Sequence, residues 1–371
     1  MTRLRATIES SLRPAISRGV LLLAFFVLCA GAAWKETPVV KGAVPFITGD
    51  GNGGFVVSYV DGKEFRFARV TASGAWSQSR AIAKDDALMV NRADFPSIAA
   101  NGNTLAATWS TKNGGHGTIV HLAQSTDGGA TWSKARTPHS SEVAPFGFVS
   151  LLPSGEAVWL DGRILPGGVE GAGDMQLRSN DALLDARVCD CCQTAMAMTS
   201  DGPIVAYRDR SDAEVRDISI VRRTASGWSK PKSLHADGWT LKGCPVNGPQ
   251  LDARGKSVVA VWFTAANNEP RVNAAFSNDA GATFGAPIRI DLGKTTGRAD
   301  VVMRADGSAV VTWIENGALT ARSVTRDGKL GDPLRIANAP GFPRLAISKE
   351  NVAVAWAAED GVHVSMFERE R

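Results

Sequence analysis

The chain has 371 residues, with 41 Lys and Arg against 37 Asp and Glu and a formal net charge of +4. The first 33 residues hold four Arg and one Glu, so the rest of the chain has a net charge of +1 and no run of basic residues. This balance excludes the charge pattern of a nucleic-acid-binding protein. The length fits one large β domain or two ordinary domains, and repeats decide between them.

Residues 1–33 are organised like a secretory signal. Four arginines precede an uncharged apolar run from Val20 to Leu28, and small residues follow up to Ala33. The run is shorter than the roughly 18 apolar residues that span a bilayer. We expect cleavage near Ala32 or Ala33 and export to the periplasm or the cell exterior. An uncleaved N-terminal anchor is the alternative, and it is the only membrane contact that the sequence suggests.

A repeated unit fills the rest of the chain, residues 34–371. Each copy has a short apolar strand ending in a large aromatic residue, with another short strand before it and an alternating hairpin after it. Four short strands in a repeat of roughly 40–50 residues is the period of a β-propeller. No segment keeps a 3.6-residue period, which excludes a helical solenoid. The aromatic residues stand 43 to 55 residues apart, at Tyr59, Trp109, Trp159, Tyr207, Trp262, Trp313 and Trp356.

The seventh repeat lacks an outer strand, because the sequence ends soon after a third strand from Gly361 to Phe367. We expect the segment Pro38–Val40 to supply this strand and to close the ring, which leaves no open sheet edge between the first and last blades. The sequence therefore predicts an all-β fold over residues 34–371. This fold is a single propeller of four-stranded blades, with seven blades preferred and six as the alternative.

Two segments match the pattern Ser-x-Asp-x-Gly-x-Thr-Trp and are called the Asp boxes below. Residues 125–132 match it in full, and residues 277–284 match it with Phe in the last place. We expect Asp127 and Asp279 to be structural, because a short carboxylate in such a turn accepts the N–H groups of its own turn while the glycines adopt positive φ. Decayed copies stand at residues 71–76, 224–228 and 325–330.

The Asp boxes and the repeats resemble the sialidase and BNR-repeat superfamily of β-propellers, and the resemblance covers most of residues 43–367. It implies the propeller fold, and it implies glycoside hydrolysis of the exo-sialidase type as an activity to be tested residue by residue. Sialidases of this superfamily use a Tyr nucleophile, an Asp acid/base and three Arg. Here Tyr59 and Tyr207, the only tyrosines, stand at the repeat aromatic position, and the family's Phe/Tyr-Arg-Ile-Pro motif is absent. Whether the chain is an enzyme stays open, since fold analogy is a weak warrant for function.

The loops that enter the inner strands and the loops that join the second and third strands share one face of a propeller, opposite the Asp boxes. We predict that charged residues of this rim bind a glycan, an anionic small molecule or a protein, since the Arg fork pairs with anions. Salt bridging between blades is the alternative. A hydrolase would need converging carboxylates at the same face. The candidate ligand contacts are Arg163, Arg208, Arg210 and Asn247, and the candidate catalytic residues are Asp94, Asp161 and Asp209.

Four cysteines lie in two of these loops. Cys189, Cys191 and Cys192 enter the fourth blade, and Cys244 enters the fifth. Because adjacent blades place equivalent loops side by side, we expect one cluster near the mouth of the central channel. Two hypotheses stay open: two disulfides, with a vicinal Cys191–Cys192 bond as one option, which export favours, or a thiolate site for copper(I) or zinc. No cofactor is certain.

The sequence thus predicts an exported, monomeric, sialidase-like propeller that binds a ligand or a metal through a cysteine-rich rim. The alternative is a glycoside hydrolase of the exo-sialidase type that acts on glycans.

Overall fold

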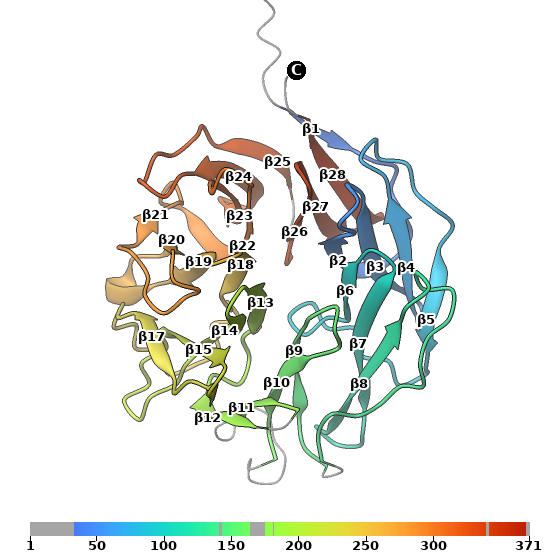
Figure 1. The fold of residues 1–371 in the computed structure, drawn as a ribbon, viewed down its shortest axis with the longest axis horizontal. Helices are drawn as coiled ribbons and strands as arrows, with labels where there is room; N and C mark the ends of the chain where they lie inside the picture. The colour runs from blue at the N-terminus through green and yellow to red at the C-terminus, as the bar shows by residue number, and fades with distance from the viewer. Residues whose placement is uncertain (1–32, 141–142, 164–174, 181, 339–340, 369–371) are drawn as a thin grey trace, which may run out of the picture.

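The computed structural model describes residues 33–140, 143–163, 175–180, 182–338 and 341–368. The predicted signal or anchor therefore lies outside the described residues, except for Ala33. Seven antiparallel sheets stand as blades around a central channel (Figure 1). The only helix within these ranges is a short 3-10 turn, η2 (Ala266–Asn268), and none is long and apolar enough to cross a membrane. The all-β, seven-bladed propeller is confirmed, and the six-bladed alternative is wrong.

The first three blades follow one plan, in which consecutive strands pair antiparallel from the channel outward. In blade 2 an isolated bridge between Leu122 and Arg136 stands where the outer strand would be. Blade 1 contains β2 (Ala43–Gly49), β3 (Phe55–Asp61), β4 (Glu64–Val70) and β5 (Arg80–Lys84); blade 2 contains β6 (Ser97–Asn101), β7 (Thr104–Lys112) and β8 (Thr118–Ser125); blade 3 contains β9 (Phe146–Leu151), β10 (Ala157–Asp161), β11 (Met175–Ser179) and β12 (Leu183–Val188).

The next three blades repeat the plan, and in blade 4 two short strands, β16 and β17, both pair with β15. Blade 4 contains β13 (Ala195–Thr199), β14 (Gly202–Arg208), β15 (Ile218–Thr224), β16 (Gly227–Trp228) and β17 (Lys232–His235); blade 5 contains β18 (Gln250–Arg254), β19 (Ser257–Thr264), β20 (Arg271–Ser277) and β21 (Ile288–Arg289); blade 6 contains β22 (Thr295–Met303), β23 (Ala309–Glu315), β24 (Ala318–Val324) and β25 (Leu334–Asn338).

Blade 7 joins the two ends of the described chain. It consists of β26 (Arg344–Ser348), β27 (Asn351–Ala358) and β28 (Gly361–Glu368), with β1 (Ala33–Glu36) paired to β28 as the outer strand (Figure 1). An N-terminal strand closes the ring, as predicted. The prediction that this strand is Pro38–Val40 is wrong, because the strand is Ala33–Glu36. Pro38 has no N–H to donate to a ladder, and Val40 makes only an isolated bridge to Val362.

The repeat aromatics occupy equivalent places, as predicted. Each lies on the second strand of its blade, and none is more than 7% exposed. They pack between neighbouring blades: Trp313 of blade 6, for example, belongs to a cluster with Val259 and Phe276 of blade 5. A buried aromatic side chain removes on the order of 150–250 Å² from water. The apolar core is therefore distributed over the interfaces between blades.

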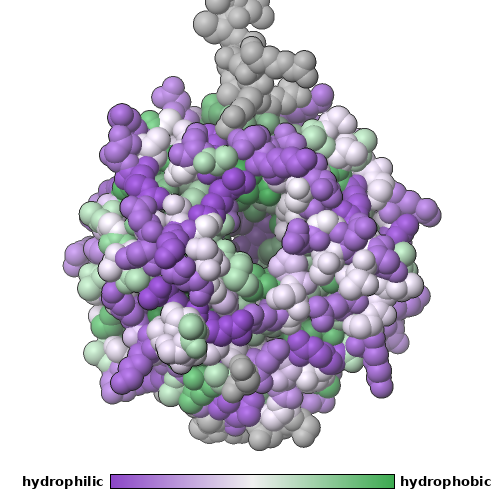
Figure 2. All heavy atoms as spheres, viewed as in Figure 1, coloured by the Kyte–Doolittle hydropathy of each residue, from purple (hydrophilic) through white to green (hydrophobic). Residues whose placement is uncertain are grey.

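The seven inner strands surround a cavity of 280 Å³ along the channel, and Figure 2 shows a hollow at the centre of the viewed face. Two carboxylates tie adjacent inner strands together around it. Asp252 accepts the N–H of Met303 at 2.6 Å, and Asp300 accepts the N–H of Leu345 at 2.9 Å. These bonds fix the spacing of the blades, and with it the spacing of the loops that enter the inner strands.

Candidate functional site

The candidate site is the cysteine rim, defined as the loop of residues 188–194 that enters β13 and the loop of residues 243–249 that enters β18. Gly248 allows the loops to approach closely, because a Cβ there would lie 2.0 Å from the carbonyl oxygen of Gln193. The Gln193 side chain accepts the N–H of Gly248 at 3.2 Å and donates to the carbonyl of Ala93 at 2.6 Å. One amide thus links the entry loops of blades 2, 4 and 5.

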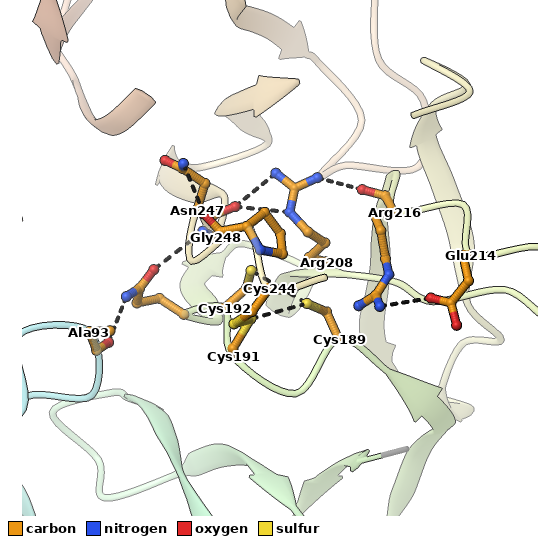
Figure 3. Close-up of a disulfide and its surroundings, with 12 residues drawn as sticks. Ala93, Cys189, Cys191, Cys192, Arg208, Glu214, Arg216, Cys244, Asn247 and Gly248 are labelled. Carbon is orange, nitrogen blue, oxygen red and sulfur yellow. Dashed lines mark hydrogen bonds and ion pairs between the residues drawn. A yellow bond between two sulfur atoms is a disulfide. The ribbon is translucent and has the colours of Figure 1, made fainter. Parts of the chain in front are cut away.

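All four cysteines form one cluster in the rim, as predicted (Figure 3). Cys191 and Cys244 form a disulfide, with Cα atoms 6.0 Å apart. Cys189 and Cys192 are free thiols, and the Cys189 Sγ lies 3.5 Å from the Cys192 Sγ and 3.8 Å from the Cys191 Sγ. The sulfurs form a connected series from the exposed Cys244 to the buried Cys192.

Within the described residues the structure has one disulfide, whereas the disulfide hypothesis called for two, and the vicinal Cys191–Cys192 bond is not formed. Consecutive Cα atoms are about 3.8 Å apart across a trans peptide, which is below the usual Cα separation of roughly 4.4–6.8 Å in a disulfide. Cys244 meets this requirement from the neighbouring blade. The disulfide therefore joins two blades and leaves a dithiol in the first loop.

Two arginines, each only 2% exposed, lie beside the cluster (Figure 3). Arg208 donates to the carbonyl of Asn247 through Nε at 2.9 Å and Nη2 at 2.7 Å, and to the carbonyl of Phe263 at 2.7 Å. Arg216 donates to Glu214 at 2.8 Å, while its Nε and Nη1 have no hydrogen-bond partner among the described residues. A buried guanidinium, that of Arg216, therefore lies beside the rim with N–H groups that can still donate hydrogen bonds.

The environment separates the acidities of the two thiols. The hydrogen bond between the Cys189 and Cys192 thiols, together with the charges of Arg216 and Arg208, holds the pKa of Cys189 below its usual value. Burial raises the pKa of Cys192 above its usual value. Cys189 is therefore the thiol that ionises first, as expected for a cysteine in an electropositive setting.

The predicted contact residues outside the cysteines have polar partners within the protein. Arg163 pairs with the buried Asp161, Nε to Oδ1 and Nη2 to Oδ2, both at 2.7 Å. Arg210 donates to Glu214 at 3.0 Å. The Asn247 Oδ1 accepts the N–H of Arg298 at 2.8 Å. Together with the carbonyl contacts of Arg208, these bonds position the loops, and ligand contact by any of these side chains stays a prediction.

The candidate catalytic carboxylates come from three different blades. Asp94 accepts the N–H of Phe148 at 2.7 Å and lines the channel cavity, while Asp161 pairs with Arg163. Asp209 accepts the Ser219 hydroxyl at 2.7 Å, and burial raises its pKa. Each carboxylate has a structural bond to its own surroundings, and the catalytic role of all three stays untested.

The tyrosines are both buried. The Tyr59 hydroxyl donates to the Ser79 Oγ at 2.7 Å, and the Tyr207 hydroxyl donates to Asp185 at 2.6 Å. Burial, with Asp185 next to it, raises the pKa of Tyr207. A phenolate nucleophile is disfavoured at this position, in keeping with its packing role.

The Asp boxes have the expected local geometry. Asp127 accepts the Ser125 hydroxyl at 2.7 Å, the Thr131 N–H at 2.9 Å and the Thr131 hydroxyl at 2.6 Å. Asp279 repeats the same three contacts with Ser277 and Thr283 at the same distances. These bonds lower the pKa of both carboxyls. The carboxylates are engaged within their own turns.

Three residues in or beside the rim were not predicted from the sequence: Gln193, Glu214 and Arg216. Gln193 directly follows the cysteines, and this adjacency was an available signal. Glu214 and Arg216 lie twenty or more residues after the first cysteine loop and reach it only through the hairpin between β14 and β15. No sequence pattern marked them.

No model of a known protein family matches the chain, and no curated protein matches it. The fold is similar to that of virginiamycin B lyase from Staphylococcus aureus, at 12% identity over 91% of this chain and 100% of that chain, with a TM-score of 0.54. It is also similar to an ulvan lyase of polysaccharide lyase family PL25, at 14% identity over 91% of this chain and 95% of that chain, with a TM-score of 0.52. At these identities the similarity shows the β-propeller fold alone.

Proposed function

We propose that this chain is an exported propeller that binds one copper(I) ion through the cysteine rim. The observation that supports this most directly is the convergence of three sulfurs: the Sγ atoms of Cys189, Cys191 and Cys192 all lie within 4.8 Å of one another. Thiolates are the ligands that select soft ions such as copper(I). Three ligands that come from four consecutive residues are also held in place by a single loop.

Copper(I) suits this donor set better than zinc. A structural zinc site is almost always closed by four ligands in a tetrahedron, whereas copper(I) accepts two or three thiolates. Within the described part of the chain, the two groups of converging donors contain three ligands each, the second being Asp190, Cys191 and Cys244. A three-sulfur site for copper(I) therefore needs no further ligand.

The surrounding charges favour thiolates. Three thiolates around a singly charged ion leave two negative charges in a buried place, which is costly without compensation. The guanidinium groups of Arg208 and Arg216 act electrostatically on Cys189. Two nitrogens of Arg216, Nε and Nη1, have no hydrogen-bond partner in the part of the chain that the structure describes. The rim thus supplies the positive charge that a thiolate site requires.

The proposal assigns the metal to the reduced rim. Cys191 is a ligand only when its bond to Cys244 is open, so an external dithiol must first supply two electrons and two protons to the disulfide. The products are the Cys191 and Cys244 thiols and the oxidised dithiol. Cys189 and Cys192 need no reduction, because they are already thiols.

The test is an anaerobic titration of the mature protein with copper(I) against a chromogenic copper(I) chelator. We expect one ion per chain after reduction, and an affinity lower by roughly 100-fold in Cys192→Ser, because even changes outside the ligand shell weaken metal sites by 10–100-fold. Cys244→Ser is the matched control, since it keeps all three ligands and should bind copper(I) without reduction. Equal affinity in reduced wild type and in the Cys189→Ser/Cys192→Ser double variant, or a preference for zinc, would contradict the proposal.

A further inference from the structure

The cysteine rim contains a dithiol and a disulfide in direct contact, which a metal site alone does not explain. Cys189 is the central sulfur: its Sγ lies 3.5 Å from the Cys192 Sγ on one side and 3.8 Å from the Cys191 Sγ on the other. Thiol–disulfide exchange proceeds by attack of a thiolate on a disulfide sulfur. The thiol and the disulfide sulfur needed for the first step are therefore neighbours in the folded protein.

We propose that the rim is an intramolecular thiol–disulfide relay that moves a disulfide between the blade-joining pair Cys191–Cys244 and the buried pair Cys189–Cys192. In the first step the Cys189 thiolate attacks the Cys191 Sγ. The Cys189–Cys191 bond forms, the Cys191–Cys244 bond breaks, and Cys244 leaves as a thiolate that takes up the proton lost by Cys189.

In the second step Cys192 attacks the Cys189 Sγ. The Cys189–Cys192 bond forms, the Cys189–Cys191 bond breaks, and Cys191 leaves with the proton lost by Cys192. Overall, Cys189 and Cys192 lose two electrons and Cys191 and Cys244 gain them. No external oxidant or reductant is consumed, so the exchange is a redistribution within one chain.

The relay connects a buried pair of cysteines with a cysteine at the protein surface. Cys189 is 1% exposed and Cys192 is 2% exposed, whereas Cys244 is an exposed residue. An external thiol or disulfide can therefore reach Cys244, while the buried pair communicates with solvent only through Cys191. After the relay, the Cys244 thiolate attacks a disulfide of a partner protein and Cys191 resolves the mixed disulfide. This reduces the partner and restores the Cys191–Cys244 bond.

The partner chemistry follows from this arrangement. The rim would donate two electrons to a protein disulfide. It would be recharged by a dithiol protein that reduces the exposed Cys191–Cys244 bond, after which Cys191 passes the electrons on to Cys189–Cys192 by the reverse of the relay. This activity uses the same sulfurs as the proposed copper site but needs no metal, so the two proposals stand or fall separately.

The relay is tested on unreduced, desalted, metal-free native protein in the presence of a chelator. N-ethylmaleimide traps any thiol that reaches the surface, and mass spectrometry of the digested protein locates the label and the disulfides. In wild type we expect Cys244 to become labelled and a Cys189–Cys192 disulfide to appear. In Cys189→Ser and Cys189→Ala we expect labelling of Cys244 to be slower by about tenfold or more, because the attacking sulfur is gone.

Cys192→Ser separates the two steps. It should still release Cys244, but the trapped disulfide should be Cys189–Cys191. Labelling of Cys244 at equal rates in wild type and both Cys189 variants would overturn the relay, as would complete protection of Cys244 in wild type. Copper(I) binding by the reduced protein is unaffected by either of those results, so failure of the relay is distinguishable from failure of the metal site.

Discussion

In each Asp box the carboxylate bonds reach no farther than four residues along the chain, whereas the bonds that join the loops of the cysteine rim link residues between 39 and 100 apart. Both places are short polar loops at the ends of strands. They differ in whether one turn or several blades supply the partners. An Asp box is complete once its hairpin folds, while the rim exists only when the blades have assembled around the channel.

The largest expected difference between the two places concerns the disulfide. Cys191 and Cys244 are 53 residues apart, and in the chain-entropy model closing such a loop stabilises a protein by about 4 kcal/mol. We expect Cys244→Ser to lower the free energy of unfolding by this amount in urea denaturation. A reducing agent should lower the stability of wild type similarly and leave Cys244→Ser unchanged. Equal sensitivity of both proteins to reduction would show that the blades do not depend on this bond.

A second difference concerns two arginines, Arg208 beside the cysteine rim and Arg69 beside the first Asp box. Arg208 donates to the buried carbonyls of Asn247 and Phe263, and buried groups that lose their partner cost about 1–3 kcal/mol each. Arg208→Met should therefore destabilise the protein by about 3 kcal/mol. The matched control is Arg69→Met beside the first Asp box. Its guanidinium is partly exposed, donates to the carbonyl of Gly102 at 3.3 Å and lies 3.9 Å from the Asp50 carboxylate.

The control variant should lose no more than about 1 kcal/mol, as is usual for surface charges. Both variants are measured by urea denaturation under oxidising conditions, so that the disulfide is constant. Similar losses at Arg69 and Arg208 would mean that contacts between distant loops are no more important than contacts beside a turn.

The same contrast explains what the sequence could predict. The repeat aromatics and the Asp boxes are local patterns, and they were sufficient for the fold, the blade count and the second-strand position of residues such as Trp159. The closing strand was misplaced because Ala33–Glu36 adjoins the signal-like segment and has no repeat partner to mark it. Its pairing with β28 is a contact between the two ends of the described chain.

At the rim the sequence predicted which residues meet and not how they bond. Equivalent loops in adjacent blades must be neighbours, so the cysteine cluster followed from topology. Cys244 is the partner of Cys191 because their Cα atoms are 6.0 Å apart. This distance cannot be derived from the spacing of the cysteines in the sequence. Arg216 was missed for the same reason, because its proximity to Cys189 arises from a hairpin and a loop of one blade packing together.

The smallest expected effect lies on the Asp-box side and depends on pH. The hydrogen bonds of the Asp boxes lower the pKa of Asp127 and Asp279 below the usual aspartate value of about 3.9. Ionisation of these carboxyls therefore stabilises the folded state fully above that value. The contribution is lost as the pH falls from about 4 through the folded pKa. An Asp127→Asn/Asp279→Asn double variant should therefore melt at a lower temperature than wild type at pH 7, and the difference in melting temperature should narrow below pH of about 4.

The control is Asp332→Asn, at an exposed position, and its melting temperature should follow that of wild type at every pH. A difference in melting temperature that stays constant down to pH of about 3 would mean that neutral side-chain contacts, rather than the charge, hold the Asp boxes together.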